Sequence, residues 1–183
     1  MIKVLCKAAV SAVLSLSLVA CSGVTDQIKE TVNTAAEAAA QMINGDVTGE
    51  IGELYSTAWF EFTVKSIERV DSYAGYSPAD DMQLIDVVIN EKNIFEDEIP
   101  MGTFDFYIDE NADAADYWVP LEPRDDTMMP EEFYLAVGES AEYHMVFEVP
   151  AEYNDLNLVY VEIDEDDGIG ATFTIKFTVT SAA

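Results

Sequence analysis

Hydrophobic and polar residues alternate with a period of two over most of the chain beyond residue 54. Phe60, Phe62 and Val64 alternate with charged or hydroxyl side chains, and residues 104–108 repeat the pattern. The alternation is clearest at residues 143–149 and 173–179, where aromatic or aliphatic side chains occupy every second position. Because successive side chains of a strand point to opposite faces, each segment predicts a strand with one buried face and one face in water.

Two segments differ from this alternation. Residues 84–89 are apolar at almost every position, which is typical of a central strand, and residues 156–163 form another apolar run. Turn signals separate the segments at Ser77-Pro78, Gly138, Pro150 and Asp167-Gly168. We expect a positive φ at Gly138 and a strand end at Pro150, since proline has no N–H for the ladder. Many short strands with regular breaks predict an all-β fold, an antiparallel β-sandwich.

The first 21 residues have a different character. Lys3 and Lys7 precede an uncharged run over residues 8–20. The run leads into the segment Leu18-Val19-Ala20-Cys21. The run is short of the ~20 residues that cross a bilayer. A basic start, an apolar core and small residues before the end are typical of a secretory signal peptide. Its last four residues resemble the lipobox of bacterial lipoproteins, in which a cysteine thiol receives diacylglycerol.

The sequence therefore predicts a lipoprotein signal peptide at residues 1–20 and a lipid on Cys21. This lipid would hold the protein on the extracytoplasmic face of the cell membrane. Two alternatives stay open, an ordinary signal peptide with a coincidental cysteine and a short membrane helix.

Residues 21–53 are expected to join the lipid to the domain. Residues 25–43 are rich in alanine, with apolar side chains near helical spacing, and Asn44-Gly45 is a stop signal. This pattern predicts a helical stalk, although its apolar stripe could instead pack on the domain or on another copy. Residues 46–53, with Gly49 and Gly52, are expected to form a hinge. The β-sandwich domain is then expected over residues 54–183.

Charge and cysteine content narrow the function classes. The chain carries 36 acidic against 8 basic residues, a formal net charge of −28. Such a charge argues against nucleic-acid binding, which needs a lysine or arginine footprint. It favours either solubility alone or attraction of cations and basic partners. Of the two cysteines, Cys6 lies in the signal peptide and Cys21 would carry lipid, so the mature domain is expected to have no disulfide.

Four segments in order carry a resemblance to a known family. They are LIDVVIN at 84–90, FDFYID at 104–109, LAVGES at 135–140 and VFEVP at 146–150. In this order the chain resembles the immunoglobulin-like domain of unknown function of bacterial secreted lipoproteins, a family related in fold to the secreted mycobacterial immunoprotective antigen. The resemblance spans roughly residues 54–177 and implies an immunoglobulin-like β-sandwich outside the cytoplasm. It supplies no catalytic residues.

The residues with catalytic potential are few. His144 is the only histidine, and alternation places it on the outer face of its strand near Glu142 and Glu148, where we expect it to be solvated. Paired carboxylates can support glycoside hydrolysis, but with this many acids the proximity of two carries no information. The sequence shows no set of mutually oriented groups, so we expect no enzyme activity.

Calcium is the one metal that the sequence suggests, and no other cofactor is expected. Oxygen ligands recur with a D-x-N-x-D spacing in one loop, and a second acidic loop follows later in the chain. Calcium takes six to eight oxygen ligands, which alternating acids on a curled loop can supply. The first loop lacks the glycine of the helix-loop-helix site, and runs of acids are usually solvated. The candidate ligands are Asp109, Asn111, Asp113 and Asp116 in the first loop, and Asp164, Asp166 and Asp167 in the second.

Aromatic residues form a candidate contact patch. Trp59 is out of phase with Phe60, and Tyr117 and Trp118 follow the first acidic loop. Exposed aromatic side chains beside acids can contact a protein, peptide or glycan, although they can equally cover a sheet end. The sequence thus predicts a non-catalytic, lipid-anchored binding or interaction module with an unknown partner. The alternative is a calcium-stabilised cell-envelope or adhesion module.

Overall fold

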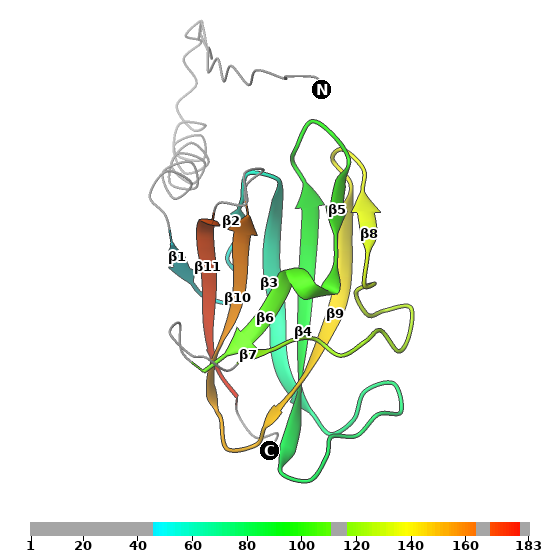
Figure 1. Ribbon diagram of the computed structural model, residues 1–183, viewed down its shortest axis with the longest axis vertical. Helices are drawn as coiled ribbons and strands as arrows, with labels where there is room; N and C mark the ends of the chain where they lie inside the picture. The colour runs from blue at the N-terminus through cyan, green and yellow to red at the C-terminus, as the bar shows by residue number, and fades with distance from the viewer. Residues whose placement is uncertain (1–45, 111–116, 164–168, 180–183) are drawn as a thin grey trace, which may run out of the picture.

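A computed structural model describes residues 46–110, 117–163 and 169–179 (Figure 1). The predicted signal peptide, Cys21 and the alanine-rich segment lie outside these ranges. No helix within them is long and apolar enough to span a membrane. The elements are β1 (Val47–Gly49), β2 (Tyr55–Ser56), β3 (Phe60–Val70), β4 (Met82–Asn93), β5 (Ile99–Met101), the 3-10 helix η1 (Thr103–Asp105), β6 (Phe106–Asp109), β7 (Tyr117–Trp118), β8 (Phe133–Leu135), β9 (Ser140–Pro150), β10 (Asp155–Ile163) and β11 (Ile169–Thr178).

The strands form two layers and a small third sheet. One layer has the order β1-β11-β10-β6-β7 and the other the order β2-β3-β4-β9, while β5 pairs with β8. Figure 1 shows the first layer on the left and in front, with β3, β4 and β9 crossing behind it to the right. The all-β sandwich predicted from the alternation is therefore confirmed. Residues 84–89 lie in β4, between β3 and β9, as expected for a central strand.

The core fills the space between the two layers with the side chains that the alternation placed inward. Phe60, Phe62 and Val64 of β3 are at most 1% exposed, and Phe147 of β9 is fully buried. The ring of Phe62 lies 4.9 Å from that of Tyr55, 5.5 Å from that of Phe106 and 5.9 Å from that of Phe173, measured between centroids. Phe62 thus contacts aromatic rings from both layers.

A second, smaller core lies on the other face of the four-stranded sheet. Leu84 of β4 and Val146 of β9 are buried there, together with Met128 from the segment that precedes β8. Tyr73 and Tyr76, from the connection between β3 and β4, pack against them. This cover explains why residues 84–89 are apolar on both faces.

Two local expectations differ from the structure. The expected hinge contains β1, whose residues Val47 to Gly49 pair in parallel with β11. Phe104 does not continue the strand of Phe106, because η1 turns the chain there and leaves Phe104 57% exposed. Asn90 lies inside β4, which continues to Asn93, and its side-chain amide donates to the carbonyl of Ala141. Gly138 has the expected positive φ of 75°, and β9 ends at Pro150 as expected.

Candidate functional site

A hollow lies where the chain leaves β5, passes through η1 and faces the start of β8. The two short strands pair in an antiparallel register that sets Pro100 opposite Tyr134 and Met101 opposite Phe133. A third paired position of these strands, Ile99 opposite Leu135, is buried in the main core. The hollow is therefore built on paired backbone fixed to the sandwich, and not on a free loop.

Gly102 sets the approach of the two sides of the hollow. Its amide donates to the Asp105 carboxylate over 2.8 Å, and the next amide, of Thr103, donates to the carbonyl of Pro130 over 3.2 Å. A Cβ atom at position 102 would overlap the carbonyl oxygen of Glu131. The close packing of η1 against residues 130–131 thus requires a residue without a side chain.

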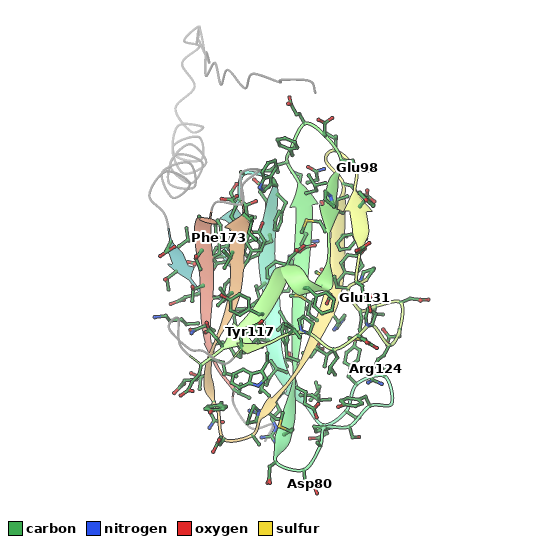
Figure 2. The ribbon with its side chains drawn as sticks, viewed as in Figure 1. Asp80, Glu98, Tyr117, Arg124, Glu131 and Phe173 are labelled. Carbon is green, nitrogen blue, oxygen red and sulfur yellow. The ribbon has the colours of Figure 1, made fainter. Side chains whose placement is uncertain are left out.

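Two exposed aromatic side chains and three carboxylates line the hollow, whose volume is about 410 Å³. Phe104 is 57% exposed and Tyr134 is 65% exposed, values that are high for such large apolar groups. The carboxylates belong to Asp105, Glu131 and Glu132, and no lysine or arginine is among the lining residues. Figure 2 shows Glu131 to the right of η1. An apolar wall beside negative charge is a surface with a defined ligand preference.

A second acidic side chain lies behind the hollow and is electrostatically coupled to Asp105. Burial raises the pKa of the Asp105 carboxyl, and the Gly102 amide opposes this rise. Glu91, on the inward face of β4, is fully buried, and neither of its carboxyl oxygens has a hydrogen-bond partner among the described residues. Burial raises the pKa of Glu91 to about 8, and the charge of Asp105 adds to the rise. The two carboxyls are therefore close enough to influence one another.

A second, polar groove of about 740 Å³ crosses the outer face of β1, β10 and β11. Hydroxyl groups of Thr48, Thr174 and Thr178 line it, with Lys176 and Asp155. The hydroxyl of Thr178 donates to the Asp155 carboxylate over 2.7 Å. This groove lacks an exposed aromatic wall, since Phe177, its one aromatic lining residue, is 8% exposed.

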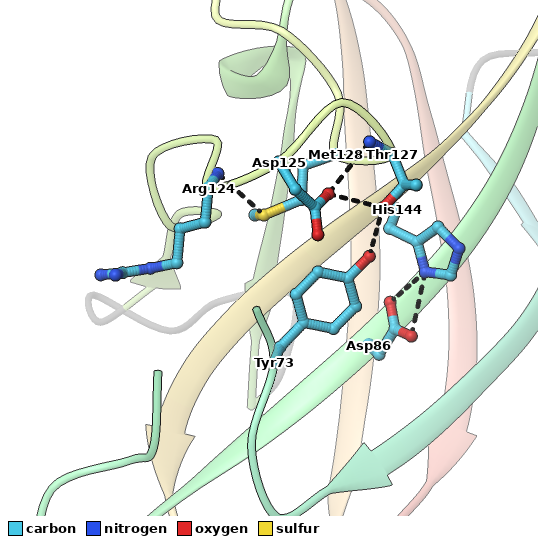
Figure 3. Close-up of polar contacts among 7 residues, drawn as sticks. All are labelled: Tyr73, Asp86, Arg124, Asp125, Thr127, Met128 and His144. Atoms are coloured by element: carbon cyan, nitrogen blue, oxygen red, sulfur yellow. Dashed lines mark hydrogen bonds and ion pairs between the residues drawn. The ribbon is translucent and has the colours of Figure 1, made fainter. Parts of the chain in front are cut away.

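His144 belongs to a set of polar contacts on the covered face of the four-stranded sheet (Figure 3). Its Nδ1 lies 2.9 Å from one carboxylate oxygen of Asp86. Nearby, the hydroxyls of Tyr73 and Thr127 are 2.8 Å apart, and Thr127 also donates to Asp125 over 2.6 Å. The expectation of a solvated His144 is wrong, because the segments over this face half-bury the ring and Asp86 of the neighbouring strand β4 pairs with it.

One predicted calcium ligand lies within the described residues. The Asp109 carboxylate is buried and accepts a hydrogen bond of 2.8 Å from the side-chain amide of Asn157. The other six candidates, residues 111, 113, 116, 164, 166 and 167, lie outside the described ranges. Inside those ranges, no group of three or more His, Cys, Asp or Glu side chains could hold a metal ion. The calcium hypothesis stays a prediction.

The predicted aromatic patch is divided between two places. Trp59 lies in the turn between β2 and β3, with its ring 4.8 Å from that of Phe95. Trp118, in β7 at the edge of the other layer, is half-buried with its ring 5.3 Å from that of Tyr153. Tyr117, its neighbour, is 62% exposed (Figure 2). Both tryptophans pack against the core, so of these three residues only Tyr117 is exposed, with its ring 5.5 Å from that of Tyr107.

The aromatic pair of the hollow was missed by sequence reasoning. Phe104 is in phase with Phe106 and Ile108, so alternation placed it inside. Tyr134 lies in a strand of three residues, which is too short for a period to be recognised. The one signal available was Gly102, two residues before Phe104, because a glycine inside a strand pattern marks a bend or a close approach of backbone.

No family model and no curated protein matches the chain. Solved structures with a similar fold include ycdA, a candidate lipoprotein of Bacillus subtilis, with a TM-score of 0.55 and 19% identity over 71% of this chain and 39% of ycdA. The yjhA protein of Bacillus subtilis has a TM-score of 0.53 and 19% identity over 69% of this chain and 98% of yjhA. The secreted protein MPT63 of Mycobacterium tuberculosis has a TM-score of 0.51 and 12% identity over 71% of this chain and 98% of MPT63.

These similarities concern the fold alone. They confirm that the chain has a β-sandwich of the immunoglobulin-like type, related in fold to a secreted mycobacterial protein. The chain spans about two fifths of the length of ycdA.

Proposed function

We propose that this protein is a non-catalytic, lipid-anchored module on the extracytoplasmic face of the membrane, which binds a partner through the hollow between η1 and β8. The observation that carries the proposal is the exposure of Phe104 and Tyr134 on two sides of one hollow. A folded domain with a filled core gains little stability from two such rings, whereas an interface gains buried apolar area from them.

A non-catalytic role is supported by the contacts of the groups with catalytic potential. His144 is bound to Asp86 through Nδ1 and lies under the segments that cover the four-stranded sheet. Its contacts tie those segments to β4 and β9. Activation of a nucleophile needs a base whose free nitrogen faces a hydroxyl or thiol. In the described ranges the hydroxyl of Thr127 is directed to Tyr73 and Asp125 instead.

Anchoring is supported by the sequence before the domain, which ends its apolar run in Leu18-Val19-Ala20-Cys21. Two of the neighbours in fold are a candidate lipoprotein and a secreted protein, which agrees with an extracytoplasmic location. The test is a Cys21→Ser substitution in the full chain, expressed in a bacterium and followed by fractionation. We expect the wild-type chain in the membrane fraction with a diacylglyceryl mass on Cys21, and the variant in the soluble fraction. An unmodified wild-type thiol would refute the anchoring.

Partner binding is tested with the same chain carrying Cys21→Ser, cross-linked to the surface of the native cells. The site variant is Phe104→Ser with Tyr134→Ser. The matched control replaces two equally exposed apolar residues elsewhere, Leu54 at 60% and Ile163 at 62%, with serine. We expect the site variant to lose cross-linked species that the control retains. Retention of all species by the site variant would contradict the proposed binding surface.

A further inference from the structure

We infer that the partner presents a basic polypeptide segment, and that the hollow between η1 and β8 holds an arginine or lysine side chain of that segment. This inference rests on the proposed binding function and names the chemistry of the partner.

The lining of the hollow matches the two parts of a basic side chain. Arginine and lysine have an apolar stem and a cationic head, which prefer an apolar wall and a carboxylate respectively. Phe104 and Tyr134 supply the wall, and aromatic faces also attract a cation directly. Asp105, Glu131 and Glu132 supply three carboxylates at the same hollow. The Gly102 amide already donates to Asp105, but a neutral apolar ligand would cover the Glu131 and Glu132 carboxylates without giving them a partner, at a cost in free energy.

An arrangement of this kind is present among the described residues of the chain itself. The guanidinium carbon of Arg124 lies 4.1 Å from the ring centroid of Tyr76. The hydroxyl of the same tyrosine donates to the Glu148 carboxylate over 2.8 Å. An arginine is thus already held over an aromatic ring near a carboxylate. The hollow offers the same two groups, but no basic side chain of the described residues lines it.

The volume of the hollow and the negative charge of the protein both agree with a basic side chain of a partner as the occupant. The volume of about 410 Å³ lies at the low end of small-ligand sites and suits one or two side chains of a bound segment. The net charge of −28 attracts basic chains from a distance and raises their rate of encounter. The local carboxylates then decide where such a chain is held.

The experiment uses the mature chain with Cys21→Ser and a defined probe, acetyl-Gly-Arg-Gly-Arg-Gly-amide. Its neutral counterpart has glutamine in place of arginine. Binding is measured by isothermal titration calorimetry at physiological salt, where attraction between distant charges is screened. The site variant is Glu131→Gln with Glu132→Gln. The control variant, Asp71→Asn with Asp80→Asn, changes the net charge by the same amount on exposed residues of the β3–β4 connection (Asp80 at the lower tip in Figure 2).

We expect the arginine probe to bind the wild-type chain and the glutamine probe to bind at least tenfold more weakly. The site variant is expected to weaken the arginine probe at least tenfold, and the control variant less than twofold. Equal weakening by the two variants would show diffuse attraction and overturn the inference, as would equal binding of the two probes or no binding of either. Loss of cross-linked partners in the Phe104 and Tyr134 variant is scored independently, so the proposed function can stand when this inference fails.

Discussion

The Nδ1 atom of His144 lies 2.9 Å from Oδ1 and 3.0 Å from Oδ2 of Asp86, so one imidazole nitrogen faces both oxygens of the carboxylate. The pair joins β9 to β4 on the face that carries the smaller core. The backbone of His144 also binds the covering segment, donating to the carbonyl of Thr127 and accepting from the amide of Met129, each over 2.9 Å. His144 therefore links the sheet to the segment that covers it.

Removal of this link is expected to loosen the cover. Asp86→Ala leaves His144 without its acceptor, and we expect a loss of about 1–2 kcal/mol in the free energy of unfolding. Asp86→Asn keeps an acceptor oxygen and is expected to lose less than half of that. Tyr73→Phe, which removes the hydroxyl that contacts Thr127 but leaves the pair intact, is the matched comparison. Urea unfolding at pH 7 measures all three, and an unchanged midpoint in Asp86→Ala would contradict the role given to the pair.

The buried Glu91 predicts a dependence of stability on pH. Burial raises the pKa of this carboxyl to about 8 in the folded protein, against 4.5 for the ordinary side chain. Between these values the unfolded chain releases the proton while the folded chain keeps it. The free energy of unfolding is therefore expected to fall as the pH rises through this window, by up to about 1.4 kcal/mol per pH unit.

Glu91→Gln tests this dependence, because the amide is neutral at every pH. We expect the variant and the wild-type chain to have similar stability near pH 4.5 and the variant to be the more stable one at pH 8.5. Urea unfolding at the two values gives the comparison. Glu142→Gln, at an exposed position of β9, removes the same charge and is expected to show no such difference. If both variants gained the same stability between pH 4.5 and pH 8.5, the pH dependence would come from net charge and not from the burial of Glu91.

The long strands could be predicted from the sequence because a period of two needs several residues to be recognised. β3, β9 and β11 each have ten or more residues, and their buried faces are those that the alternation indicated. The elements that the sequence did not reveal are short. β1 and β8 have three residues each, and β1 pairs in parallel with the far end of the chain, a contact that no local pattern encodes.

The hollow could not be predicted for a related reason. Phe104 has the phase of a buried strand residue, and only the turn of η1 rotates it outward. Its partner Tyr134 is separated from it by thirty positions along the chain and approaches only through the pairing of β5 with β8. Glu91, by contrast, could have been found. It follows Val87 and Ile89 with a period of two, which places its carboxyl on the inward face of β4.

Gly102 is predicted to be intolerant of any side chain. A Cβ atom there would overlap the carbonyl oxygen of Glu131, so Gly102→Asn is expected to displace the backbone and cost about 1–3 kcal/mol. Gly138→Asn is the comparison, since Gly138 has open space around it and a φ of 75°, which asparagine adopts more readily than other residues. Urea unfolding is expected to show the larger loss at position 102. A larger loss at 138 would mean that backbone conformation matters more than close approach.

Calcium binding by the acidic loops predicts a shift in thermal stability. If Asp109 and the six outlying candidates bind calcium, millimolar calcium is expected to raise the Tm and a chelator to reverse the rise. Asp109→Asn keeps an oxygen that can accept from Asn157 but removes the charge, so it is expected to reduce the shift. The same concentration of magnesium, which demands a stricter octahedral site, is the control. An unchanged Tm with calcium would exclude the calcium-stabilised alternative.

The aromatic residues of this protein are predicted to divide into those that stabilise the fold and those that serve binding. Phe62 is fully buried and contacts rings from both layers, so Phe62→Ala is expected to lower the free energy of unfolding by about 3–5 kcal/mol. Phe104 and Tyr134 keep 57% and 65% of their area exposed in the folded domain, so their double replacement by serine is expected to cost less than about 1 kcal/mol.

Urea unfolding and partner cross-linking, measured on the same preparations, decide whether this division holds. The double variant should keep its unfolding midpoint and lose its partners, because rings that stay in water stabilise the domain only weakly but bury their area when a partner covers them. A loss of several kcal/mol in the double variant would instead assign both rings to the packing of η1 against β8. Phe104 and Tyr134 would then be structural residues, and the hollow would lose its claim to be a binding surface.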